Sequence, residues 1–173
     1  MAKGGDKKRV ICPEGFDLRP LQVMEFIGFE LEIVTPTCIQ GRFVVSERSA
    51  QAHGVLHGGI SAFIAESLGS LGAFVVSGFQ PVAGVDLSIS HLRAAPIGLE
   101  IEAKATPVHI GGRLHVWEVK FISATSSSEG LPKQESSQTS EPNLIAVSKL
   151  IVTVQPSKRA AKLQDDKAIP SRL

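Results

Sequence analysis

LHGGISAFIAES, residues Leu56 to Ser67, begins the longest apolar region of this 173-residue chain. From Ile60 to Val76 the apolar residues recur every three or four positions, which is the spacing of a helix that packs one face on a core. These residues are Ile60, Phe63, Ile64, Leu68, Leu71, Phe74 and Val75. We therefore expect the rest of the chain to wrap around this helix.

Glu66 places a carboxylate inside this helix, nine residues after His57. At about 100° per residue, Glu66 and Ser70 lie one turn apart at the edge of the apolar arc. Burying a glutamate is costly unless something pairs or uses its charge. Gly58 and Gly59 leave the N–H groups of the helix start uncovered, where the helix dipole favours a developing negative charge. Together these residues predict an acid/base or nucleophilic carboxylate beside a candidate oxyanion hole.

Each part of this pattern also has a simpler interpretation. A His-Gly-Gly sequence is often only a turn into a helix, and a single helical glutamate usually lies on a solvated face. The combination favours a site, because the glutamate interrupts a helix that is apolar over most of its circumference. Ala62, Gly69 and Ala73 lie just beyond Glu66 and Ser70, and we expect these small residues to let a ligand or another backbone come close.

The composition is that of one ordinary globular domain, with 43% hydrophobic residues, 20% charged residues and a formal net charge of +1. These values give no indication of binding to nucleic acid or a membrane surface. Cys12 and Cys38 have no metal-like spacing and indicate free thiols in a reducing compartment rather than a disulfide framework. Polar residues within Ile60 to Val85 argue against a transmembrane segment, and MAKGGDKKRV is no secretory signal. With no cluster of His, Cys and Asp, we expect no metal or other cofactor.

Turn residues and alternating hydrophobicity divide the chain into further elements. One long helix preceded by two strands and followed by four predicts an α+β protein, an antiparallel sheet wrapped around one central helix. The strand near Val85 is expected to bury Val85, Leu87 and Ile89. The predicted elements around the long helix are a short helix near Leu21 to Ile27 and strands at Phe29–Thr35, Cys38–Val45, Val85–Ile89, Leu99–His109, Leu114–Ser123 and Leu144–Val154.

Three segments flank or interrupt this predicted domain of residues 21–155. Residues 1–20 are expected to be a flexible N-terminal segment. Ala124 to Pro142, ATSSSEGLPKQESSQTSEP, is dominated by Ser, Glu, Gln, Thr and Pro, which indicates a mobile insertion within a hairpin. Residues 156–173 form a polar C-terminal tail.

The chain ends in Ser171-Arg172-Leu173, which is close to the Ser-Lys-Leu type of peroxisomal address. Arg172 replaces the lysine and keeps the cation that the import receptor reads. The polar stretch before the tripeptide favours an accessible end. We therefore expect a peroxisomal localisation and the import receptor as a partner.

Four elements of the sequence resemble the hotdog-fold acyl-CoA thioesterases, in the branch of the 4-hydroxybenzoyl-CoA and 1,4-dihydroxy-2-naphthoyl-CoA thioesterases. The likeness covers roughly Leu21 to Val154. With the C-terminal tripeptide, the chain is similar to the plant peroxisomal members of this branch, which act in phylloquinone biosynthesis. The Ser-rich insertion departs from the compact bacterial pattern. The four elements are Gln51 six residues before His57, the LHGG turn, Glu66 followed by Ser70, and HIGGRLHVWEV at His109 to Val119.

The resemblance implies a catalytic group of Glu66, Gln51, His57 and Gly58. Glu66 would act as a nucleophile that forms a transient acyl anhydride, or as a general base for water. The Gly58 N–H would polarise the thioester carbonyl. Gln51 and His57 would help to position that carbonyl and the leaving sulfur.

The resemblance also implies a set of substrate-binding residues. Ser70 would contact the aromatic acyl group or the attacking water. His91 and the His109–Arg113 loop would line the route of the pantetheine and nucleotide arm, with Arg93 as a further candidate. From the residues alone, a packed His91, a solvated Arg113 and a plain hairpin turn at the two glycines are equally open interpretations. The substrate-binding set is Ser70, Gly59, His91, His109, Gly111, Gly112 and Arg113.

A lone subunit of this fold would expose one helix face and an edge strand, so the resemblance implies a homotetramer built as a dimer of dimers. Glu66 of one subunit would meet the His57-Gly58 turn or the His91 strand of its neighbour. The function that follows is hydrolysis of an aromatic acyl-CoA, with 1,4-dihydroxy-2-naphthoyl-CoA as the expected substrate.

Two alternatives stay open. One is a broader thioesterase for medium- or long-chain fatty acyl-CoA, which the same scaffold could support with a wider acyl pocket. The other is a non-catalytic acyl-CoA-binding protein, and Glu66 argues against it because a binding module has no need for an ionised group at the thioester. Glu66, Ser70 and the strip of small residues favour a flat, partly polar pocket suited to a hydroxylated ring.

Overall fold

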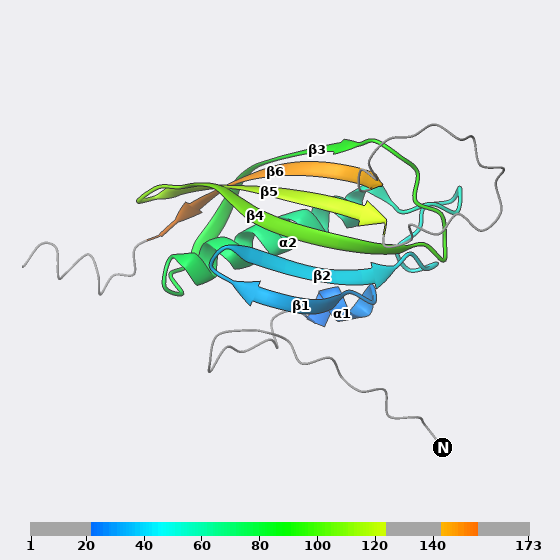
Figure 1. Ribbon diagram of the computed structural model, residues 1–173, viewed down its shortest axis with the longest axis horizontal. Helices are drawn as coiled ribbons and strands as arrows, with labels where there is room; N and C mark the ends of the chain where they lie inside the picture. Colours follow the sequence, from blue (N-terminus) through cyan, green and yellow to red (C-terminus); the bar gives the residue numbers. More distant parts are fainter. Residues whose placement is uncertain (1–21, 124–142, 156–173) are drawn as a thin grey trace, which may run out of the picture.

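A computed structural model describes residues 22–123 and 143–155 and shows one antiparallel sheet curved around a long helix (Figure 1). Every predicted helix and strand is present, and the α+β architecture is confirmed. The predicted N-terminal segment with Cys12, the Ser-rich insertion and the tail with Ser171-Arg172-Leu173 lie outside the described residues. The elements are α1 (Gln22–Phe26), β1 (Glu30–Thr35), β2 (Cys38–Val44), α2 (Gly58–Val76), β3 (Val82–His91), β4 (Glu100–Ile110), β5 (Leu114–Ser123) and β6 (Leu144–Val154).

The six strands follow the order β1-β2-β4-β5-β6-β3, and every neighbouring pair is antiparallel. The strand β3 pairs with β6 rather than with β4, so β3 and β1 form the two edges of the sheet. The helix α2 packs against all six strands, as Figure 1 shows for its course along the inner face. This topology places the β3 edge beside α2.

In the core, α2 packs against a tryptophan of β5. Trp117 is fully buried, and a Cβ atom added at Gly72 would lie 2.5 Å from its ring, too close for a real contact. Gly69 likewise lies against Leu150 of β6, where an added Cβ would be 2.6 Å from Cδ2. These two glycines let the helix approach the sheet.

Of the two expectations for the strip of small residues on α2, the structure shows the close approach of another element and no ligand surface. Gly69 and Ala73 are buried against the sheet, and Ala62 is half-buried. The reason is the rotation of α2, which turns the small side of the helix toward the large side chains of β5 and β6. The strip therefore serves packing.

Strand β3 also differs from its prediction in one respect. Leu87 and Ile89 are half-buried and pack on the core, but Val85 is 60% exposed. A bulge between Gly84 and Asp86 interrupts the pairing with β6, and an extra residue in one strand shifts the alternation of inward and outward side chains. The bulge therefore turns Val85 out of the core at the edge of the sheet.

By length and composition α2 could cross a membrane, with a mean hydropathy of 1.6 over its most apolar window. Half of that window is buried inside the fold, and Glu66 lies within it. Its packing against the sheet agrees with the prediction of a helix wrapped in protein.

Cys38 at the start of β2 is a free, half-buried thiol, as predicted. Burial raises the pKa of the Cys38 thiol, an effect that the nearby Lys104 partly offsets. A raised pKa keeps the group in its less reactive thiol form.

Candidate active site

A pocket of about 530 Å³ lies at the N-terminal end of α2. It brings together Gln51, His57, Gly58 and His91, which were predicted from the sequence, and Arg93, which was named as a further candidate. The first three come from the loop before α2 and its first residue, and the other two come from the end of β3 and the segment after it. The full lining is Gln51, Val55, Leu56, His57, Gly58, His91, Leu92, Arg93, Ala94, Ala95 and Ile145.

The loop that carries Gln51 and His57 is held by backbone hydrogen bonds. The His57 N–H donates to Ser49 O at 2.8 Å, and the Gln51 N–H donates to Val55 O at 2.8 Å. Ser49 is fully buried, and its Oγ accepts a hydrogen bond from the Ser46 N–H at 2.9 Å. A loop fixed in this way holds its polar side chains in one place, as a functional site requires.

His57 caps the N-terminus of α2 with its ring. Its Nδ1 accepts a hydrogen bond from the Gly59 N–H at 2.9 Å, so Nδ1 holds a lone pair. The proton of the neutral ring is then on Nε2, which is a hydrogen-bond donor. Gly59 was predicted to contact the substrate, but its N–H is already engaged in this cap.

Gly58 and Gln51 supply two further donors. No hydrogen bond among the described residues uses the Gly58 N–H, which is one of the unpaired groups of a helix start. The Oε1 atom of Gln51 accepts from the His53 N–H at 3.1 Å, which leaves the side-chain NH₂ as a donor. The pocket is thus lined by three residues with available N–H groups, an arrangement suited to a carbonyl oxygen that gains negative charge.

Glu66 lies away from this pocket within one chain. Its carboxylate faces the β3 edge, with Oε1 2.9 Å from the position of an added Cβ at Gly84. Gly58 lies instead under the ring of His91, whose Cε1 would be 3.2 Å from an added Cβ. Gly84 and His91 are seven residues apart on β3, which corresponds to on the order of 20 Å. Within a single chain, the Glu66 carboxylate therefore lies apart from the three donors.

In the single chain Glu66 is exposed. It lies on the flank of α2 that faces the edge strand β3, and no described strand continues the sheet beyond that edge. Ser70, one turn further along α2, is half-buried.

The predicted loop His109–Arg113 is the turn between β4 and β5, at the other end of the molecule. The Arg113 O accepts from the Val154 N–H at 2.8 Å, and Val154 pairs with Val82 at the start of β3. His91 at the end of β3 pairs with Ala146, eight residues earlier on β6, so the separation is about 27 Å. In Figure 1 this turn lies at the left with the end of α2, opposite the loop before α2.

Gly111 and Gly112 shape this turn. An added Cβ at Gly111 would lie 2.8 Å from Leu114 O, whereas Gly112 has open space. The buried His115, which sequence reasoning missed, donates from Nε2 to Gly111 O at 3.1 Å. Burial lowers the pKa of His115, so this ring favours its neutral form and stabilises the turn.

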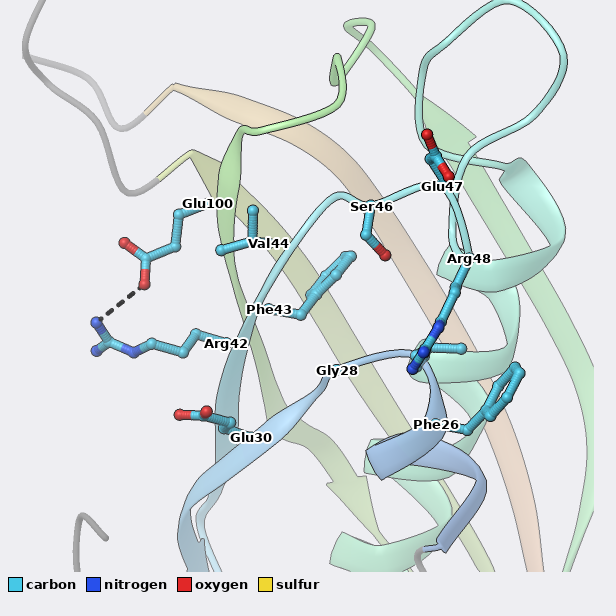
Figure 2. Close-up of a pocket in the computed structure, with 11 residues that line it drawn as sticks. Phe26, Gly28, Glu30, Arg42, Phe43, Val44, Ser46, Glu47, Arg48 and Glu100 are labelled. Atoms are coloured by element: carbon cyan, nitrogen blue, oxygen red, sulfur yellow. Dashed lines mark ion pairs between the residues drawn. The ribbon is translucent and has the colours of Figure 1, made fainter. Parts of the chain in front are cut away.

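A second pocket of about 480 Å³ lies between α1 and the ends of β1 and β2 (Figure 2). It contains none of the predicted site residues. Arg42 Nε lies 2.6 Å from Glu32 Oε1, and its Nη1 lies 3.6 Å from Glu100, as the dashed line in Figure 2 marks. The Arg48 guanidinium lies 5.4 Å from the centre of the Phe26 ring. Both arginines are engaged within the chain. Because the predicted site residues gather in the pocket at α2 instead, that pocket is the better candidate for chemistry.

Within residues 22–123 and 143–155 no group of three or more His, Cys, Asp and Glu side chains is placed to hold a metal ion. The polar groups that the pocket at α2 offers are its N–H donors.

Comparison with known proteins identifies relatives of this chain. The sequence model of the family described as the thioesterase superfamily matches residues 53–128. The chain is 44% identical over 103 residues to 1,4-dihydroxy-2-naphthoyl-CoA thioesterase 2 of Arabidopsis thaliana, a match that spans 60% of this chain and 66% of that protein. It is 34% identical over 106 residues to the 1,4-dihydroxy-2-naphthoyl-CoA hydrolase of Listeria monocytogenes, spanning 60% of this chain and 84% of that protein.

Solved structures agree with this relationship. A thioesterase from Haemophilus influenzae superposes with a TM-score of 0.63 and 29% identity, covering 82% of this chain and 92% of that chain.

Proposed function

Since this chain belongs to the thioesterase superfamily and is a thioester hydrolase, we propose that it hydrolyses 1,4-dihydroxy-2-naphthoyl-CoA to the free acid and CoA. The observation that carries the proposal is the pocket at the start of α2, where Gln51, His57 and Gly58 offer N–H donors. The names of the Arabidopsis and Listeria relatives, which are those of a 1,4-dihydroxy-2-naphthoyl-CoA thioesterase and a 1,4-dihydroxy-2-naphthoyl-CoA hydrolase, support the choice of acyl group.

In the proposed reaction the thioester carbonyl oxygen accepts hydrogen bonds from the Gly58 N–H and from the side chains of Gln51 and His57. Glu66 either attacks the carbonyl carbon, which expels the CoA thiolate and leaves an acyl anhydride that water hydrolyses, or takes a proton from the attacking water. The donors stabilise the charge that the oxygen gains in either case. The proposed reaction uses no cofactor beyond the CoA of the substrate.

The proposed site needs two chains. Antiparallel pairing of β3 with the β3 of a second copy, about a two-fold axis, would place the start of one strand beside the end of the other. Glu66 lies near the start of β3, beside Gly84, and the pocket lies near its end, beside His91. The pairing would therefore bring the carboxylate of one chain to the pocket of its neighbour, and two such dimers would form the homotetramer.

The same pairing gives the predicted CoA-binding residues a shared location. The His109–Arg113 turn lies near the start of β3 and would approach the pocket of the second chain, where His91 and Arg93 lie. Arginine side chains suit the phosphates of the nucleotide arm. Ser70 would contact the acyl group next to Glu66.

For the substrate, we expect 1,4-dihydroxy-2-naphthoyl-CoA to exceed palmitoyl-CoA in kcat/KM by about tenfold or more. A rigid hydroxylated ring has polar partners at Glu66 and Ser70, whereas a flexible chain loses rotamer entropy without gaining them. Tenfold corresponds to about 1.4 kcal/mol of differential transition-state binding. Release of free CoA from both substrates by the purified protein measures the ratio. A kcat/KM for palmitoyl-CoA that equals or exceeds the aromatic value would move the chain to the fatty acyl-CoA alternative.

For localisation, we propose that Ser171-Arg172-Leu173 directs the protein to peroxisomes, where its reaction would serve phylloquinone biosynthesis. A fluorescent reporter that carries the last ten residues of the chain at its C-terminus is expected to enter peroxisomes in plant cells. The same reporter without Leu173 is the control and is expected to stay in the cytosol. A cytosolic signal from the intact tail would refute the localisation.

A further inference from the structure

Ser61 is a buried hydroxyl directly behind the donor pocket. It lies in the first turn of α2 and is fully buried. Its Oγ lies 2.8 Å from Gly58 O and 2.7 Å from Nε2 of His91 on β3. Sequence reasoning assigned it no role, because a serine near a helix start is common.

The number of protons fixes the direction of both hydrogen bonds. A serine hydroxyl has one proton to donate, and a backbone carbonyl can only accept. For both contacts to be hydrogen bonds, Ser61 donates its proton to Gly58 O and His91 donates from Nε2. Neutral His91 is then the Nε2–H tautomer, and its Nδ1 is an acceptor.

These bonds connect His91 to Gly58, the residue whose N–H the proposed function uses. The His91 ring covers Gly58 so closely that an added Cβ there would lie 3.2 Å from Cε1. Ser61 holds this ring on one side and the Gly58 carbonyl on the other. A small displacement of a group in an active site lowers the rate, so a bond of this kind has kinetic consequences.

We propose that Ser61 is a positioning residue of the active site, which fixes His91 as the Nε2–H tautomer over Gly58 and so orients the Gly58 N–H toward the thioester carbonyl. This inference rests on the proposed function for its kinetic part. Its structural part, the tautomer of His91, is independent of any substrate.

The first test reads the tautomer in the unmodified protein. Long-range proton–nitrogen NMR spectra of ¹⁵N-histidine-labelled full-length protein distinguish the two neutral forms of each ring, and His91→Gln assigns the His91 signals by their loss. We expect the Nε2–H pattern. An Nδ1–H pattern for His91 would overturn the proposal, whether or not any variant folds.

The second test compares Ser61→Ala with Ser67→Ala, which removes a half-buried hydroxyl from the same helix. Ser61→Ala is expected to lower kcat by about tenfold with KM within about twofold, and to mix the His91 tautomers. Ser67→Ala is expected to leave kcat and the His91 tautomer pattern unchanged. A folded Ser61→Ala protein with unchanged kcat and an unchanged His91 pattern would overturn the role of Ser61. Absence of turnover by the unmodified protein would instead contradict the proposed function, so the two failures are distinguishable.

Discussion

Replacement of Glu66 by glutamine is expected to lower kcat by at least about 10²–10⁴-fold while substrate binding stays nearly unchanged. The amide has the shape of the carboxylate, but it neither attacks carbon nor accepts a proton from water. Glu66 is exposed and makes no hydrogen bond or ion pair with the other described residues, so the variant should fold as the unmodified protein does. Steady-state release of CoA gives kcat, and binding of a non-hydrolysable CoA thioether gives the affinity.

Glu47→Gln is the matched control for this substitution. Glu47 is an exposed glutamate that lines the second pocket rather than the one at α2. The Glu47→Gln substitution removes the same charge as Glu66→Gln and should leave kcat unchanged. If Glu66→Gln retains the kcat of the unmodified protein, the assignment of the carboxylate is wrong.

Loss of the donors at Gln51 or His57 is expected to lower kcat by about 10²–10³-fold, with a much smaller effect on KM. Contacts that strengthen as the carbonyl oxygen gains charge affect kcat rather than ground-state binding. Alanine at either position removes the donor. At Gln51, glutamate is the sharper variant, because a carboxylate oxygen can still accept from the His53 N–H while the NH₂ donor is gone.

The corresponding variant of the cap is His57→Asn. Asparagine is a good N-cap and can accept from the Gly59 N–H, so the helix start keeps its cap while the Nε2 donor is lost. Gln155→Glu, at an exposed position after β6, controls for the added charge of Gln51→Glu. A rise confined to KM would reduce Gln51 and His57 to ground-state binding residues.

The elements of the fold could be predicted from the sequence because their signals are local. Leu114–Ser123 and Leu144–Val154 alternate cleanly, and the structure has strands at those bounds. The pairing of β3 with β6 could not be predicted, because strand order depends on contacts between residues far apart in the chain. Val85 was wrongly predicted to be buried for a related reason, since the bulge beside it cannot be seen in the alternation of apolar and polar residues along the sequence.

The site shows the same division between local and distant information. The His57 cap and the open Gly58 N–H follow from a His-Gly-Gly helix start, and the structure adds which nitrogen of the ring is occupied. Glu66 stood out as a polar residue in an apolar helix, but the pattern could not say that it faces an edge strand. Ser61 had no signal at all, because its meaning depends on a histidine thirty residues away.

The central claim is that Glu66 of one chain acts with Gln51, His57 and Gly58 of another. The most direct test mixes the two inactive variants Glu66→Gln and Gln51→Glu, by unfolding and refolding them together in equal amounts. About half of the randomly formed dimers would be mixed, and each mixed dimer would have one of its two sites intact, so about a quarter of the activity of the unmodified protein should return. Activity that stays at the level of the separate variants, in mixtures shown by mass spectrometry to contain mixed dimers, would contradict the shared site.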